Sequence, residues 1–193
     1  MLVAGTDING DSDNGQFRYV AFVIGTESGI NTLYNEIGLG NIEMKNLKKP
    51  QRKFVAKKMN FTNPNFLAIC LKVDRQNLIQ YITTHPHSKA KFIEKKEVHR
   101  YFDRVLLSLI RDKIDGFCQH HDSRFVKLNF QCDPDMTKTI TNWELLNSFK
   151  GKAYEFADAI SFCYQHKWSP VKGCKYIDYS EKIKQRMRDR FIK

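Results

Sequence analysis

The first side chain in the sequence that could do chemistry is Asp7, at the end of the short apolar segment 2–7. This segment, Leu-Val-Ala-Gly-Thr-Asp, predicts a β-strand. A carboxylate buried in a sheet costs several kcal/mol unless it is neutralised, paired or bound to a metal. Asp7 is therefore the first candidate for a functional acid.

Two more acids stand directly after a predicted strand. The aromatic and β-branched residues of 124–132 predict this strand, and Asp133 and Asp135 follow it. The ends of adjacent strands in a sheet converge although they are far apart in sequence. We therefore expect Asp133 to lie near Asp7.

A third acid lies on a predicted helix, residues 152–164, which follows Gly151. At 100° per residue Asp158 falls between Tyr154 and Phe162, its neighbours one turn before and one turn after, whereas Glu155 is expected to face water. A carboxylate among aromatic side chains is stabilised in its charged form by a cation. Asp158 thus joins Asp7 and Asp133 as a predicted site residue.

Three converging carboxylates fit Mg²⁺, a hard ion that binds oxygen ligands and retains several waters. In a two-metal site one ion activates water, and both stabilise in-line displacement at phosphorus. These acids therefore predict hydrolysis of phosphodiester bonds.

The acids of the first turn have a simpler explanation. Asp11 and Asp13 lie in a stretch of turn-forming residues, where Asp and Asn side chains bond their own backbone. A calcium loop counted from Asp7 would need Gly and Glu where the chain has Ser12 and Arg18. We expect Asp11 and Asp13 to build the turn.

The overall charge points to a polyanionic partner. The 193 residues include 32 Lys and Arg against 21 Asp and Glu, a net charge of +11. Nucleic acid is the commonest partner of such a chain. No stretch has the roughly 18 apolar residues of a membrane span, so a membrane partner is not expected. Five scattered cysteines predict reduced thiols and a cytoplasmic protein.

The basic residues concentrate in two segments. No Asp or Glu occurs from position 44 to position 73, a stretch whose first part is densely basic and predicts a helix over 50–59 with Pro50 in its first turn. A solvated surface is the alternative for this first segment, and a second basic helix is expected at the C-terminus. The predicted nucleic-acid-binding residues are Lys45, Lys48, Lys49, Arg52, Lys53, Lys57, Lys58, Arg186 and Arg190.

The remaining segments complete a mixed sheet with packed helices. A hairpin is expected over 2–25, and Asp74 is expected to cap a helix that ends before Pro86. The other expected elements are helices at 27–37, 94–115 and 179–193, a strand at 65–73, a short strand within 136–150, and a loop at 166–177.

The chain resembles the ribonuclease H-like superfamily. The likeness rests on Asp7 in the first strand of a hairpin, Asp133 after the fourth strand, and Phe-Ala-Asp-Ala-Ile at 156–160 on a late helix. It implies a single α/β domain over 1–193, a mixed β-sheet with helices on both faces, interrupted by a basic insertion at about 27–62 and closed by a basic helix at about 179–193.

The same resemblance implies that Asp7, Asp133 and Asp158 bind Mg²⁺ or Mn²⁺. Asp135 is a further candidate ligand, and Asp103 or Glu97 is a candidate for a fourth acid on the helix after the third strand. A metal-dependent nuclease is the leading hypothesis. A non-catalytic nucleic-acid-binding protein of the same fold and a protein-interaction module remain as alternatives.

Overall fold

The predicted N-terminal hairpin is present in the computed structural model as β1 (Leu2–Asn9) and β2 (Phe17–Thr26), paired antiparallel. The structure describes residues 2–9, 16–120, 128–131, 151–168 and 170–192. β1 continues two residues past Asp7, which pairs with Ala21 and so lies within the strand.

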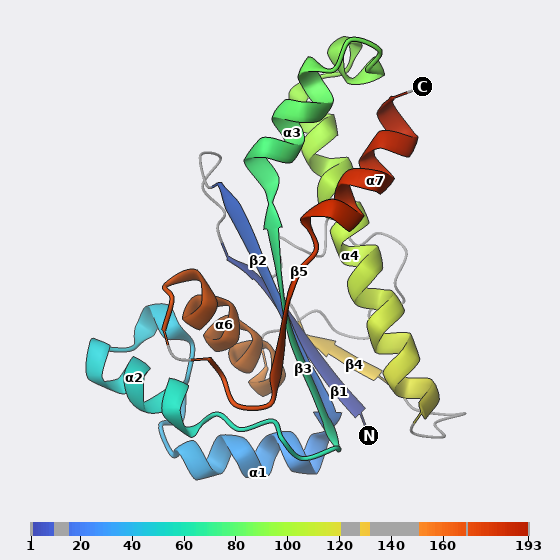
Figure 1. Ribbon diagram of the computed structural model, residues 1–193. Helices are drawn as coiled ribbons and strands as arrows, with labels where there is room; N and C mark the ends of the chain where they lie inside the picture. The colour runs from blue at the N-terminus through green and yellow to red at the C-terminus, as the bar shows by residue number, and fades with distance from the viewer. Residues whose placement is uncertain (1, 10–15, 121–127, 132–150, 169, 193) are drawn as a thin grey trace.

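The hairpin is part of a five-stranded mixed sheet with the order β4-β1-β2-β3-β5 (Figure 1). The other strands are β3 (Phe66–Asp74), β4 (Leu128–Gln131) and β5 (Cys174–Asp178). β2 and β3 pair antiparallel, whereas β4 runs parallel to β1 and β5 runs parallel to β3. The predicted α/β class with a mixed sheet is confirmed.

β5 makes the prediction of a loop over 166–177 wrong for residues 174–177. β5 is a short edge strand with mostly exposed or half-exposed side chains, so it has no apolar alternation to identify it. Its place depends on Gly173, whose φ is +77° and where an added Cβ would lie 2.3 Å from the carbonyl carbon of Phe61. Only the folded chain brings these two segments together.

Helices cover both faces of the sheet, as Figure 1 shows. One face packs against α1 (Glu27–Ile37), α2 (Lys49–Lys58) and α6 (Lys152–Gln165). The other packs against α3 (Arg75–Thr84), α4 (Lys95–His120) and α7 (Ser180–Phe191). Two 3₁₀ turns, η1 (Met44–Asn46) and η2 (Lys89–Phe92), lie in the connections.

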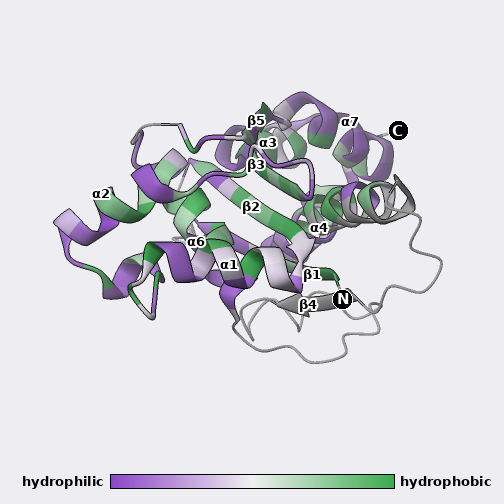
Figure 2. Ribbon diagram, turned by 90° about the horizontal axis from the view of Figure 1, so that it is seen from below, coloured by the Kyte–Doolittle hydropathy of each residue, from purple (hydrophilic) through white to green (hydrophobic). Residues whose placement is uncertain are grey.

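The sheet separates two apolar cores. Alternate residues of β2 point to opposite sides, so that Phe22 is buried beneath α4 and Val23 beneath α6. Figure 2 shows β2 as a hydrophobic strand in the centre, with the mostly hydrophilic α7 at the periphery. None of the described helices is long and apolar enough to cross a membrane.

Several helix ends are set by the local signals expected from the sequence. Gly38 ends α1 in the left-handed region with a φ of +72°. The Asp74 carboxylate accepts a hydrogen bond of 3.2 Å from the Asn77 amide and caps α3. Pro50 lies in the first turn of α2, so this predicted helix start is confirmed.

α6 approaches β1 so closely that the strand needs glycine at one position. A Cβ added to Gly5 would lie 2.1 Å from the carbonyl carbon of Ala153 and 2.2 Å from the amide nitrogen of Tyr154. These are backbone atoms, which cannot rotate away as a side chain does. Gly5 therefore lets α6 lie directly on the strand that carries Asp7.

We predict that Gly5→Ala destabilises the protein, because the methyl group must displace the backbone of α6. Overpacking of this kind costs about 1–3 kcal/mol, a fall in Tm of several degrees for a chain of this size. Gly116→Ala is the matched control: it lies in α4 with nothing within 4 Å of the added methyl, and should stabilise by about 0.4–1 kcal/mol. Equal Tm values for the two variants in thermal unfolding would contradict this account.

Candidate active site and nucleic-acid interface

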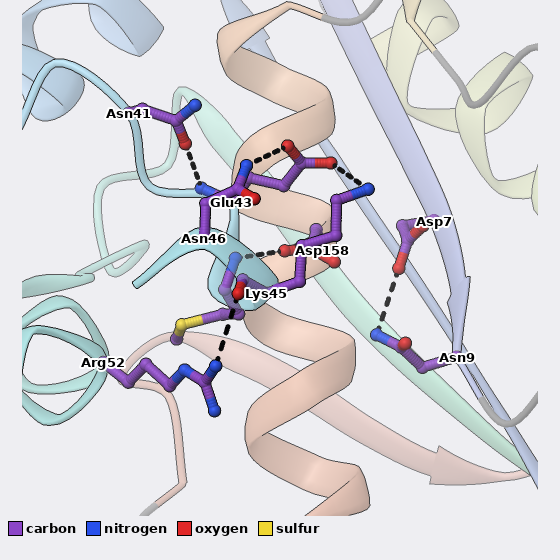
Figure 3. A network of polar contacts seen from close by, with 9 residues as sticks. Asp7, Asn9, Asn41, Glu43, Lys45, Asn46, Arg52 and Asp158 are labelled. Carbon is purple, nitrogen blue, oxygen red and sulfur yellow. Dashed lines mark hydrogen bonds and ion pairs between the residues drawn. The ribbon is translucent and has the colours of Figure 1, made fainter. Parts of the chain in front are cut away.

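Asp7 is a buried acid on the face of the sheet that α6 covers, with a residue exposure of 7%. Its Oδ2 accepts hydrogen bonds from Ser161 Oγ at 2.9 Å and from Asn9 Nδ2 at 3.1 Å. Figure 3 shows Asp7 and Asn9 together on β1. The expectation of a buried acid with a specific environment is thus met at Asp7.

Ser161 connects the strand to the helix. Its fully buried hydroxyl lies 2.9 Å from both Asp7 Oδ2 and the main-chain oxygen of Asp158, and Asn9 Nδ2 donates to it at 2.5 Å. The single hydroxyl proton can be given to only one of the two oxygens at a time. Sequence reasoning missed Ser161; the available signal was a polar residue three positions after Asp158 on an otherwise apolar helix face.

The Asp158 carboxylate contacts the connection between α1 and α2. The Met44 amide donates a 2.6 Å hydrogen bond to Asp158 Oδ2 (Figure 3). One turn earlier on α6, Glu155 Oε2 accepts from the Ile42 amide at 2.8 Å and from the Tyr34 hydroxyl at 2.6 Å. Glu155 and Asp158 of α6 thereby accept hydrogen bonds from the backbone amides of Ile42 and Met44, two residues apart in the α1–α2 connection.

The prediction that Glu155 faces water is therefore wrong. The angle of 100° per residue gives the direction of each side chain around the helix, but it does not show which other segment packs there. The α1–α2 connection covers the helix face that was expected to be exposed to solvent. Burial raises the pKa of the Tyr34 hydroxyl, and its hydrogen bond to Glu155 raises it further. Tyr34 is thus a neutral donor that anchors Glu155.

Glu43, between these two held amides, is a buried acid that sequence reasoning did not single out. Its exposure is 8%, and its two carboxylate oxygens bind Lys45 Nζ at 2.9 Å and Asn46 Nδ2 at 2.7 Å. Figure 3 shows it beside Asp158 on the α1–α2 connection. Glu43 directly precedes the basic segment, and no motif or periodicity in the sequence marked it as a buried acid.

The predicted three-acid cluster is brought together only in part. Asp7 and Asp158 share one face of the sheet and are linked through Ser161, although their carboxylates bind different groups. Asp133 and Asp135 lie outside the described residues, as does the expected strand within 136–150. Across the described part of the chain, no three His, Cys, Asp or Glu side chains are grouped to hold a metal ion.

Asp103 is not brought to this site. It lies on α4, on the opposite face of the sheet, near Arg18 and Arg75. Burial raises the pKa of Asp103, while the two guanidinium groups act in the lowering direction. Glu97, the other candidate on this helix, binds Arg100 at 2.6 Å.

Nucleophilic thiol chemistry is disfavoured at Cys70, Cys163 and Cys174. Burial raises the pKa of Cys163 to about 12, with the charge of Asp158 adding to the effect, and burial also raises that of Cys174 to about 12. The pKa of Cys70 is raised by the same cause. Because the thiolate is the nucleophile, these protonated thiols are poor candidates for catalysis at neutral pH.

The basic segment forms a charged surface beside the acids. Arg52 lies over the ring of Phe162 on α6, 5.1 Å from its centroid, and donates to the main-chain oxygen of Lys45. Lys58 lies 5.7 Å from the ring centroid of Phe54. The exposed lysines of this surface, which we call the α2 surface, are Lys45, Lys48, Lys49, Lys53, Lys57 and Lys58.

The C-terminal arginines lie on the other face of the sheet. Arg186 donates to Ser108 Oγ at 2.9 Å and approaches Asp112 at 3.6 Å, both on α4. Arg190 lies over Tyr101, 5.7 Å from the ring centroid. The structure therefore does not join Arg186 and Arg190 to the α2 surface.

Comparison of the chain with protein-family models, with curated proteins and with solved structures finds no match.

We predict that Asp158→Ala destabilises the protein by about 1–3 kcal/mol, because it leaves the buried Met44 amide without its acceptor. Asp158→Asn retains an oxygen at this place and should lose less. Glu36→Ala, at an exposed position of α1, should remain within about 0.5 kcal/mol of the wild type. Urea unfolding of the three variants tests this order, and a neutral Asp158→Ala would refute the anchoring role.

Proposed function

We propose that the protein is a metal-dependent nuclease that hydrolyses phosphodiester bonds, with Asp7 at the centre of its site. One observation carries the proposal: β1 and the parallel strand β4 are paired at Gly5 and Gln131. In the chain, Asp7 follows Gly5 by two residues, and Asp133 follows Gln131 by two residues. Each of these two neighbouring parallel strands therefore leads to an acid two residues beyond a paired position, which favours a shared site.

The donor types suit Mg²⁺ or Mn²⁺, since all the proposed ligands are carboxylate oxygens. Asp7 and Asp158 supply two of them on one face of the sheet, and Asp133 or Asp135 must supply the third. Bound divalent ions would supply a polarised water and stabilise charge at phosphorus. In this proposal Ser161 and Asn9 orient the Asp7 carboxylate through their hydrogen bonds.

The resemblance to the ribonuclease H-like fold supports the same proposal. The observed mixed sheet, the acid in the first strand of a hairpin and the acid on α6 agree with what that resemblance implies. Fold likeness alone does not establish an activity, so the proposal depends on the acids themselves.

Nucleic-acid binding without hydrolysis is the second candidate. It is favoured by the hydrogen bonds that Asp158 accepts from Met44 and Asp7 accepts from Ser161 and Asn9, because acids with such partners can be purely structural. The exposed lysines of the α2 surface serve this function equally well. Activity measurements on acid variants separate the two candidates.

We predict that Asp7→Asn abolishes Mg²⁺- or Mn²⁺-dependent cleavage of nucleic acid while retaining the fold, because it keeps the side-chain shape and removes a charged ligand. Asp103→Asn is the matched control and should retain cleavage, since Asp103 lies on the opposite face of the sheet. Cleavage of labelled single-stranded, duplex, hybrid and branched substrates measures the effect. Wild-type protein that binds these substrates without cleaving any of them would establish the second candidate instead.

We also predict that binding weakens linearly with the logarithm of salt concentration, because each phosphate contact releases counterions. Replacing Lys53, Lys57 and Lys58 by Ala should reduce the slope by about 0.7 per lost contact on single strands and about 0.9 on duplex DNA. Arg190→Ala should leave the slope unchanged, because Arg190 packs on Tyr101 across the sheet. Weak binding by the wild type that is insensitive to salt would favour a protein-interaction module.

A further inference from the structure

A basic cleft lies between α2 and the segment that joins α6 to β5. Its volume is about 770 Å³, within the range of small-molecule and cofactor sites. Backbone contacts join the two sides next to it: the Phe61 amide donates to the Lys172 carbonyl at 2.9 Å, and Asn60 forms an isolated β-bridge with Lys172. The cleft is thus a built part of the fold.

Four lysines from two separate segments line this cleft. α2 contributes Lys53 and Lys57, and the α6–β5 connection contributes Lys167 and Lys172. The described residues that line it include no Asp or Glu. Like charges gathered around one cleft repel one another, so a bound anion would relieve an unfavourable arrangement. The cleft therefore has the electrostatics of a phosphate site.

Lys167 occupies a backbone position that glycine would fill more easily. Its φ is +54°, and it ends α6 in a left-handed cap: the Lys167 amide donates to Tyr164 at 3.3 Å and the Trp168 amide donates to Cys163 at 2.9 Å. Glycine is the usual residue at such a cap, and a non-glycine residue there is strained. A lysine in this place retains a charge in the cleft at a cost in stability.

Trp168 supplies an aromatic wall to the same cleft. Its ring packs edge-on against Phe162, with centroids 5.4 Å apart and an interplanar angle of 86°, and Arg52 lies over that Phe162 ring. Proteins that bind single strands combine a positively charged groove with aromatic side chains on which bases stack. The cleft contains both components.

We propose that this cleft binds an unpaired nucleotide of a single nucleic-acid strand, with its base against Trp168 and its phosphates on the four lysines. The base of a duplex is stacked within the helix and cannot reach such a wall, so the cleft selects single-stranded or splayed regions. This inference rests on the proposed function and names its substrate class.

The cleft and the acidic site share helix α6. From Asp158 to the last helical residue, Gln165, the axis advances about 10 Å at 1.5 Å per residue. Phe162 lies one turn beyond Asp158 and contacts both Arg52 and Trp168. The cleft therefore lies next to the end of the helix that also carries Asp158, on the same face of the sheet as Asp7.

The test measures binding of fluorescently labelled oligonucleotides in EDTA, where no metal-dependent cleavage occurs. We expect the wild type to bind a single strand more tightly than the matching duplex. Trp168→Ala should weaken single-strand binding roughly 5- to 150-fold, the loss expected for one stacked base. Trp168→Phe keeps an aromatic ring against Phe162 and should retain most of the affinity and the Tm.

Lys167→Gly should weaken binding without lowering the thermal stability of the protein. Removing the charge should reduce the salt slope on single strands by about 0.7, while relief of the left-handed backbone should leave the Tm equal or higher. Lys113→Ala, at an exposed position of α4 on the opposite face, is the control and should change neither quantity. Unchanged binding by Lys167→Gly would overturn the proposal.

Three further outcomes would also decide the matter. Equal affinity for duplex and single strand, or Trp168→Ala with unaltered binding, would overturn the cleft as a single-strand site. A mononucleotide that competes as well as an oligonucleotide would identify free nucleotides, not a strand, as the ligand. Binding is measured without metal and does not depend on cleavage. A wild type that cleaves nothing would therefore contradict the nuclease proposal without changing the result of this binding test.

Discussion

The contact between α6 and β1 at Gly5 is the constraint on which the site depends. Without a Cβ at this position, the helix backbone lies against the strand, where an added methyl would approach Ala153 to 2.1 Å. The same contact places Ser161 within 2.9 Å of Asp7. One small residue thus allows the strand that carries Asp7 and the helix that carries Asp158 to lie in direct contact.

The second constraint is the pair of hydrogen bonds from the α1–α2 connection to α6. Glu155 and Asp158 hold the amides of Ile42 and Met44, and the chain continues from there into basic α2. Hydrogen bonds with a charged partner are stronger than neutral ones, so α2 is held against α6. This arrangement brings the acids of α6 and the basic α2 surface side by side.

These two constraints place negatively charged side chains of α6 close to positively charged side chains of α2. Asp158 is buried and Glu155 is half-buried, and both are paired with backbone amides, whereas the lysines of α2 remain exposed. A polyanion on the lysines would lie beside the acids, and a divalent cation is the natural link between a phosphate and a carboxylate. The proposed strand-binding cleft and the proposed nuclease site are therefore connected through α6.

The sequence alone determined the features that depend on near neighbours. The hairpin, the glycine cap of α1, the aspartate cap of α3 and the helices α4, α6 and α7 follow from periodicity and capping residues, which act within a few positions. Tertiary structure alone decided the partner of β5, the hydrogen bonds of Glu155, the contacts of Ser161 and the separation of Asp103 from Asp7 by the sheet. Each of these depends on segments far apart in the chain, whose approach leaves no local pattern because it is fixed by packing on the two faces of the sheet.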